Sequence, residues 1–226
     1  MTRGLTTIGQ AVAASIPNLR SPRSQGSKVP VHREIWEPDD DAERLERARK
    51  AYIAAGCPKL HTAREIDLAK SPAEWVAARE GIVGRLGGGF TIALIGHRGP
   101  GKTQLAQQAV QAACQRGLTA LYTRAMTFFL AIRATYGTDA SEQSVIDHFS
   151  KPGLLVIDEL HERSETLFEN RMLNHLVDIR HGDTRDTLLV GNLTADGFEE
   201  SVGASISERL RETGGIIECT WNSFRK

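Results

Sequence analysis

Short apolar runs alternate with longer segments of helical periodicity from about residue 90 onward. The runs cover residues 90–95, 118–122, 154–157, 187–190 and 216–219 and are four to six residues long. Such lengths are typical of buried strands. The alternation predicts a three-layer α/β/α fold, in which helices cover both faces of a mostly parallel sheet.

The segments between these runs carry apolar residues at helical spacing. Leu105, Ala106, Ala109, Val110 and Ala113 lie on one face of a predicted helix that Gly117 ends. Further helices are predicted over 71–86 with Ser71 as N-cap, over 125–136 and 142–149, from the cap Ser164 to the residue before Gly182, and over 206–212.

The amino-terminal part of the chain differs in composition. Residues 1–30 contain four basic side chains and no acid, and such a segment cannot bury much surface, so we expect it to be flexible. A charged helix is predicted to start near Asp39 and to stop at Gly56, with acids toward its beginning and bases toward its end. We therefore divide the chain into an extension over residues 1–70, flexible and then helical, which binds a partner, and a core over residues 71–226.

A glycine-rich motif follows directly after the first apolar run. It has the pattern G-x-x-x-x-G-K-T of a phosphate-binding loop (P-loop) between a strand and a helix. Glycines allow a tight turn whose N–H groups point at phosphate oxygens, and Lys102 is expected to reach the β- and γ-phosphates. The Thr103 hydroxyl is expected to be a ligand of Mg²⁺. The predicted ATP-binding residues are Gly96, His97, Arg98, Gly99, Pro100, Gly101, Lys102 and Thr103.

Two carboxylates end the apolar run at residues 154–157. Asp158 and Glu159 are predicted to lie at the carboxyl edge of the sheet, where ligands of open α/β folds bind. Asp158 is expected to bind the nucleotide's Mg²⁺, and Glu159 to polarise the attacking water. Asn192 follows the run at residues 187–190 in the same way, so we expect it to orient water or contact the γ-phosphate.

Composition restricts the class of protein. The chain has 28 basic and 28 acidic residues among 226, which excludes a globally basic nucleic-acid coat but permits a local basic patch. Its three cysteines lack the C-x-x-C spacing of a zinc site. No apolar run approaches the about 18 residues of a membrane helix, and the start lacks a signal-peptide core, so we expect a cytoplasmic protein without membrane contact.

The order and spacing of these motifs resemble the DnaC/IstB-like AAA+ ATPases, over residues 90–225. Besides the P-loop and the Asp158-Glu159 strand, the resemblance rests on the helix ending at residues 177–180, on Gly191-Asn192, on residues 207–211 and on residues 221–225. It implies that Glu159 is the catalytic acidic residue, that Asn192 is the first sensor and that Arg209 is an arginine finger acting on a neighbouring subunit. It also implies a homo-oligomer when nucleotide is bound.

Several assignments stay open at this point. Arg180, Arg185 and Arg211 compete with Arg209 for the finger role, and Arg225 is expected to contact nucleotide. Basic and aromatic residues interleave at Arg124, Phe128, Phe129, Arg133 and Tyr136, which suggests DNA contact, although helical spacing favours the two phenylalanines as core.

The resemblance implies one of two biological roles. A DnaC-like loader acts on a replicative helicase and contacts single-stranded DNA, and the short core with its flexible extension favours this reading. An IstB-like helper assembles on duplex DNA and serves a transposase. A scaffold that binds nucleotide without turnover is the third reading, and the two acids Asp158 and Glu159 disfavour it.

Overall fold

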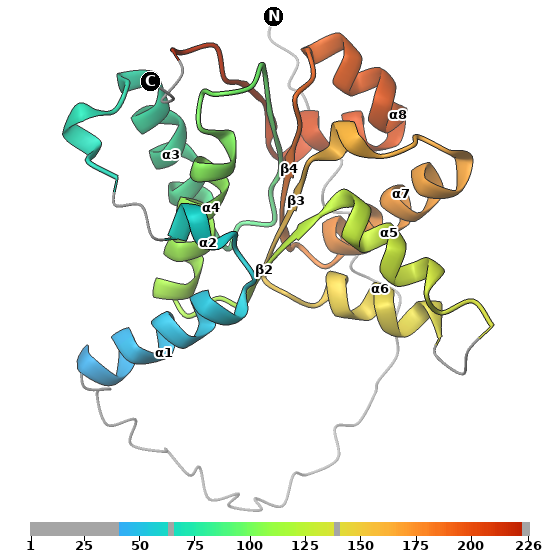
Figure 1. The fold of residues 1–226 in the computed structure, drawn as a ribbon, viewed down its shortest axis with the longest axis horizontal. Coiled ribbons are helices and arrows are strands. Elements are labelled where there is room, and N and C mark those ends of the chain that lie inside the picture. Colours follow the sequence, from blue (N-terminus) through green and yellow to red (C-terminus); the bar gives the residue numbers. More distant parts are fainter. Residues whose placement is uncertain (1–40, 63–65, 138–140, 223–226) are drawn as a thin grey trace, which may run out of the picture. The chain divides into compact units, whose positions relative to one another are not determined.

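Five parallel strands form the centre of the structure, in the order β2-β3-β4-β1-β5 (Figure 1). They are β1 (Thr91–Ile95), β2 (Ala120–Arg124), β3 (Leu154–Asp158), β4 (Asp186–Val190) and β5 (Gly215–Glu218). The computed structural model describes residues 41–62, 66–137 and 141–222, which belong to one compact unit. The predicted α/β fold with a parallel sheet is confirmed.

Helices lie on both faces of this sheet (Figure 1). On one face are α1 (Asp41–Ala54), α2 (Lys59–Thr62), the 3₁₀ turn η1 (Leu68–Lys70), α3 (Ala73–Arg85) and α4 (Lys102–Gln115). On the other are α5 (Ala125–Arg133), α6 (Glu142–Ser150), the 3₁₀ turn η2 (Leu160–Glu162), α7 (Leu167–Gly182) and α8 (Ala195–Thr213).

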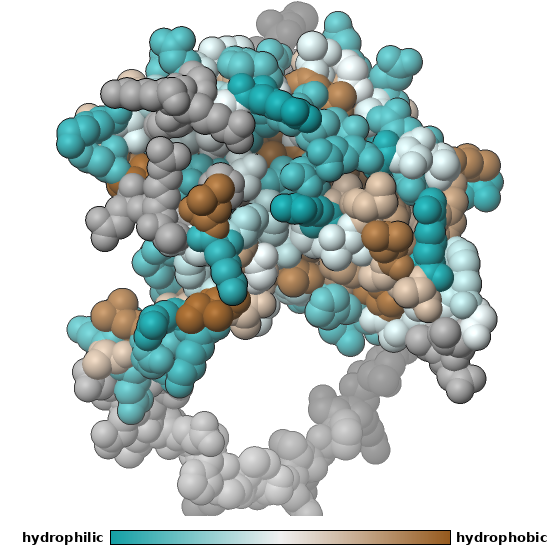
Figure 2. Space-filling model, in the orientation of Figure 1, coloured by the Kyte–Doolittle hydropathy of each residue, from teal (hydrophilic) through white to brown (hydrophobic). Residues whose placement is uncertain are grey.

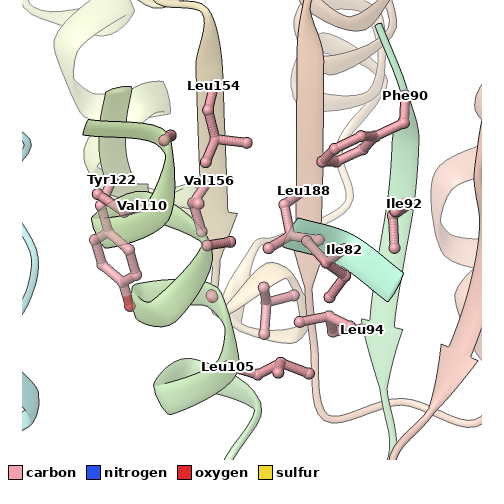
Figure 3. Packing of buried hydrophobic residues seen from close by; sticks show 14 of the residues in the cluster. Ile82, Phe90, Ile92, Leu94, Leu105, Val110, Tyr122, Leu154, Val156 and Leu188 are labelled. Atoms are coloured by element: carbon pink, nitrogen blue, oxygen red, sulfur yellow. The ribbon is translucent and has the colours of Figure 1, made fainter. Parts of the chain in front are cut away.

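Successive residues of each central strand point to opposite faces, as the pleat of a strand requires. Ile92 and Leu94 of β1 pack with α3 and α4, whereas Ala93 and Ile95 pack in the core beneath α5 to α8. Figure 3 shows the first of these cores, where Ile82 of α3 and Leu105 of α4 meet the strand residues. Both faces of the sheet are therefore buried, which explains why the sequence shows continuous apolar runs rather than alternation.

Several boundaries differ from the prediction. Helix α5 ends at Arg133 and not at residue 136, and β2 covers Ala120–Arg124 and not 118–122. Helix α7 begins after Thr166, whose side chain accepts a hydrogen bond from the Glu169 N–H, and not after Ser164. Glu165 has φ 52°, a left-handed conformation that separates Ser164 from the helix. Helix α8 is much longer than the predicted 206–212 and has a break at Gly203, where φ is 79°. Glycines in its first half weaken the helical signal of the sequence.

The segment preceding the predicted core packs against it. Tyr52 of α1 lies within hydrogen-bond reach of Gln107 of α4, and the Ala55 carbonyl accepts a hydrogen bond from the Tyr122 N–H at 2.7 Å. Large apolar side chains on α1 and α2 remain exposed, namely Leu45, Ile53 and Leu60, and brown areas lie over this part of the molecule in Figure 2. The boundary at residue 70 stays a prediction. Among the described residues no helix is both long and apolar enough to cross a membrane.

Candidate nucleotide-binding site

The P-loop connects the end of β1 to the start of α4. Gly96, Gly99 and Gly101 have φ values of 124°, 111° and 82°, which glycine adopts without the steric cost of a side chain. A Cβ atom at Gly96 would lie 2.7 Å from the Cys219 carbonyl oxygen, so the loop also needs glycine for its close approach to the end of β5. The motif residues thus have the strand-loop-helix setting that the sequence predicted.

Lys102 begins α4 and turns its side chain back toward the loop. Its ammonium group donates hydrogen bonds to the carbonyl oxygens of Gly96 at 2.8 Å and His97 at 2.5 Å. Burial lowers the pKa of Lys102, while the thiol of Cys219 and the carboxylate of Asp158 raise it. The ammonium group is held at the loop by these carbonyls, so a triphosphate bound by the loop would meet a positive charge.

Asp158 is the centre of a hydrogen-bond cluster at the end of β3. Its Oδ2 accepts from the Thr103 hydroxyl at 2.9 Å and from the Tyr122 hydroxyl, and its Oδ1 accepts from the Glu159 N–H at 2.7 Å. Burial, together with the Asp158 carboxylate, raises the pKa of the Tyr122 hydroxyl, which therefore stays protonated as a donor. The sequence reasoning missed Tyr122, because its contact depends on the pairing of β2 with β3.

The oxygens of Thr103 and Asp158 fit a hard cation. Mg²⁺ prefers oxygen ligands and is usually held by one or two protein groups plus phosphates and water. The described residues contain no cluster of three or more His, Cys, Asp or Glu side chains that could hold a metal without such help. The donor set therefore suits an ion that arrives with a nucleotide.

Glu159 follows Asp158 in a left-handed conformation, with φ 59° and ψ 37°. Such a conformation is uncommon for a residue other than glycine and is often found at functional sites. Its Oε2 lies 3.1 Å from Nε of Arg124, at the end of β2. Burial raises the pKa of the Glu159 carboxyl, and the Arg124 guanidinium opposes this rise.

Asn192 lies at the end of β4, beside His161 of η2. The Asn192 N–H donates to Nδ1 of His161 at 3.2 Å, and the carboxamide nitrogen lies 3.0 Å from Nε2 of the same ring. The sequence reasoning did not single out His161. Its position three residues after Asp158 was the only signal, and that signal becomes informative only when the turn after β3 is known.

A cavity of about 530 Å³ joins these groups. It is lined by five loop residues together with Asp158, Glu159 and Asn192, so the structure brings the three predicted strand ends to one place. Segments that the prediction did not include also line it: Ile66, Asp67, Lys70, Ser71, Trp75, Gln104, His161 and Glu162. Gly96, His97 and Pro100 shape the loop but do not line the cavity.

The predicted finger, Arg209, lies on α8 and does not line this cavity. Its Nε is 2.8 Å from Oδ1 of Asp178 on α7, and its Nη1 donates to the Ser205 carbonyl at 2.8 Å. The Arg209 side chain is 23% exposed and so lies partly at the surface. A finger that acts on a neighbouring subunit needs such a surface position. Arg225 lies outside the described residues.

The other three candidates for the arginine finger make contacts within this chain. Arg180 is completely buried and donates to main-chain carbonyls, which contradicts its candidacy as a finger. Arg211 pairs with Glu199 at 3.0 Å, and Arg185 with Asp183 at 3.4 Å. Arg180 therefore stabilises the fold of its own chain and does not reach a neighbouring subunit.

The aromatic residues proposed for DNA contact divide into two groups. Phe128 and Phe129 are completely buried and pack against each other, so their interpretation as core is confirmed. Tyr136 is 54% exposed, and Arg133 is 3.1 Å from the buried carboxylate of Glu169. Stacking of bases on the two phenylalanines is thus excluded.

Two known proteins of Escherichia coli are similar to this chain in sequence. Over 132 residues the chain is 26% identical to the replicative helicase loader DnaC of Escherichia coli, covering 58% of this chain and 54% of that protein. It is 27% identical over 134 residues to the uncharacterized protein YdaV of E. coli, covering 59% and 54%. The chain thus spans about half the length of the curated relatives it matches.

Solved structures share the fold. The crystal structure of DnaI has a TM-score of 0.58 at 18% identity, covering 74% of this chain and 94% of that one. The crystal structure of the DnaC helicase loader has a TM-score of 0.57 at 14% identity, covering 75% and 98%. The family model described as "IstB-like ATP binding protein" matches residues 89–226. This match covers more than half of the chain, which therefore belongs to the IstB-like ATP-binding protein family.

Proposed function

We propose that this protein hydrolyses ATP with the help of Mg²⁺. The observation that carries the proposal is the meeting of Thr103, Asp158, Glu159 and Asn192 around one cavity beside the P-loop. Nucleotide phosphates would be bound by the loop N–H groups and by Lys102, which would exchange its carbonyl partners for phosphate oxygens. Thr103 and Asp158 would hold Mg²⁺, whose charge opposes that of the phosphates.

The hydrolytic step requires a base and a water-orienting group. The Glu159 side chain borders the same cavity without being part of the Thr103–Asp158 pair, so its carboxylate would accept a proton from an attacking water. The Asn192 carboxamide supplies the second contact to that water or to the γ-phosphate. Arg124 holds the Glu159 carboxylate at 3.1 Å and must release it, or move with it, for this step.

We infer that Arg209 completes the site from a neighbouring subunit. Phosphoryl transfer spreads negative charge over equatorial oxygens, and a planar guanidinium supplied in trans can stabilise that charge. The Asp178 carboxylate, 2.8 Å from Arg209, keeps the guanidinium at the surface of α8. Hydrolysis would then depend on homo-oligomer formation.

For the biological role we propose a loader of a replicative helicase that contacts single-stranded DNA, as the likeness to the helicase loader DnaC suggests. The exposed Leu45 and Ile53 of α1 offer an apolar surface outside the ATPase core for that partner. The second candidate is a transposase helper on duplex DNA, which the IstB-like family match supports.

Phosphate release by the full chain should be measured with ATP alone, with single-stranded DNA and with duplex DNA. Stimulation by single strands together with co-purification of the host's replicative helicase supports the loader, whereas stimulation by duplex supports the helper. The Lys102→Ala protein is the control for contaminating ATPases. A folded wild-type protein that binds ATP without any turnover would refute both the loader and the helper and would leave a nucleotide-binding scaffold as the function.

A further inference from the structure

The turn η2 places an imidazole directly over the end of β4. The turn lies in ordinary contact with Gly191, where a Cβ atom would be 3.7 Å from Cβ of Leu160 and 3.9 Å from the main-chain nitrogen of His161. The His161 side chain is only 15% exposed, and both of its ring nitrogens face nitrogen atoms of Asn192.

The main-chain contact determines the tautomer of His161. A backbone N–H can only donate, so Nδ1, which lies 3.2 Å from the Asn192 N–H, must be the acceptor. In the neutral ring the proton is then on Nε2. An Nε2–H group needs an acceptor, but the carboxamide nitrogen of Asn192, 3.0 Å away, is also a donor.

The conflict disappears when the two ends of the carboxamide are exchanged. Oxygen and nitrogen of an Asn side chain are assigned from the hydrogen-bond network. With Oδ1 of Asn192 toward His161, the ring accepts one hydrogen bond from Asn192 and donates another to it. Glu162, whose Oε1 is 3.8 Å from Nε2, is too far away to replace Oδ1 as acceptor.

We propose that His161 is a positioning residue, which holds the Asn192 carboxamide by its oxygen so that the NH₂ group faces the nucleotide cavity. The inference rests on the proposed ATPase function. In this orientation Asn192 presents N–H donors, which suit a γ-phosphate oxygen or the oxygen of the attacking water. Without His161 the carboxamide can turn over and present its oxygen, which repels a phosphate oxygen.

Three substitutions separate the two contacts. His161→Ala removes both of them. In His161→Asn the side-chain oxygen can occupy the place of Nδ1 and accept from the Asn192 N–H, but it cannot reach the carboxamide. In His161→Gln the terminal NH₂ group lies near the place of Nε2 and can donate to Oδ1 of Asn192. His175→Ala is the matched control, because His175 is an exposed histidine on α7.

The measurements are kcat and KM for ATP turnover by the full chain and the affinity for a fluorescent ATP analogue. Displacement of one catalytic contact can cost on the order of 10²-fold in rate, so we expect His161→Ala to lower kcat about 10- to 100-fold with little change in analogue affinity. His161→Gln should recover most of kcat, His161→Asn should stay slow, and His175→Ala should match wild type. Recovery by Asn but not by Gln would overturn the proposal.

A double-mutant comparison tests whether His161 acts through Asn192. In the Asn192→Ala protein, adding His161→Ala should lower kcat by less than about twofold further, because the group that His161 positions is already absent. If the double variant instead lost kcat by the product of the two single losses, His161 would act independently of Asn192 or on the fold, and the proposal would be refuted.

The tautomer can be tested without any turnover. Long-range ¹⁵N–¹H spectra of ¹⁵N-labelled full chain distinguish the two neutral tautomers, and the His161→Gln spectrum identifies the His161 signals by their absence. We expect the Nε2–H form. An Nδ1–H form overturns the inference even if ATP is hydrolysed, whereas an Nε2–H form in a protein without turnover supports the arrangement and refutes the ATPase function alone.

Discussion

Replacement of Arg180 by alanine should destabilise the protein severely. The guanidinium is completely buried at the end of α7 and makes six hydrogen-bond contacts. Its acceptors are the Thr187 hydroxyl and five main-chain carbonyls at the end of α6, in the following turn and at the start of β4: those of Phe149, Ser150, Pro152, Gly153 and Asp186. Arg180 thus joins α6, α7 and β4.

The magnitude follows from what remains after truncation. The Gly153 carbonyl keeps a second donor, the Asp186 N–H at 2.9 Å, and the Asp186 carbonyl keeps its partner in the parallel pairing of β4 with β3, so three carbonyls lose their donor. A buried polar group without a partner costs about 1–3 kcal/mol, which gives roughly 3–9 kcal/mol. Burying the guanidinium itself costs several kcal/mol, and its removal returns this amount. We therefore expect a net loss of about 3–5 kcal/mol, a large part of the about 5–15 kcal/mol that stabilises a typical domain.

Urea unfolding followed by circular dichroism measures this change. Arg171→Ala, at an exposed arginine on the same helix, is the matched control and should change the free energy of unfolding by less than about 0.5 kcal/mol. Arg180→Lys should lie between Arg180→Ala and wild type, because an ammonium group has three donors rather than five. A loss of less than about 1 kcal/mol for Arg180→Ala would refute the reasoning, and loss of ATPase activity at full stability would return Arg180 to the finger candidates.

The remaining predictions concern the nucleotide site. Lys102→Ala should abolish binding of a fluorescent ATP analogue while the domain stays folded, and Glu159→Gln should keep binding but lose phosphate release; equal binding defects would contradict these separate roles. Arg124→Ala should move the acid limb of kcat to higher pH, because the guanidinium lowers the Glu159 pKa and its removal raises that pKa further; an unchanged limb would show that Arg124 does not act on Glu159. Arg209→Ala should bind ATP yet lose about 10³-fold or more in assembly-stimulated rate, and mixing it with Lys102→Ala should restore part of the activity; a mixture that co-assembles and stays inactive would contradict action in trans.

Much of the fold could be predicted because strands buried on both faces leave an unmistakable apolar run. Asp158, Glu159 and Asn192 could be placed beside the P-loop for a related reason. Parallel strands end at one edge of the sheet, so residues that are distant in sequence meet there when each directly follows a strand. The prediction requires only the positions of the strands along the chain and not their order in the sheet.

The contacts that were missed require the order of the strands or the course of a turn. Tyr122 reaches Asp158 because β2 and β3 are neighbours, and His161 reaches Asn192 because Glu159 takes a left-handed conformation before η2. Neither fact can be read from spacing along the chain. Arg180 is different, since Leu173, Leu176 and Val177 form a stripe that Arg180 continues at the next turn. A charged residue in an apolar stripe was a visible sign of a buried structural role.

The P-loop itself is held by more than its own motif. In a loop whose N–H groups turn inward to bind phosphate, several carbonyl groups must turn away from that site and need other donors. Trp221, after β5, meets this need for the Pro100 carbonyl. Trp75 of α3 lies 3.5 Å from the Gly101 carbonyl, which also accepts a hydrogen bond from the Leu105 N–H at 2.9 Å. These tryptophans come from opposite ends of the core in sequence. The conformation of the loop therefore depends on the folding of the whole sheet and not on the glycines alone.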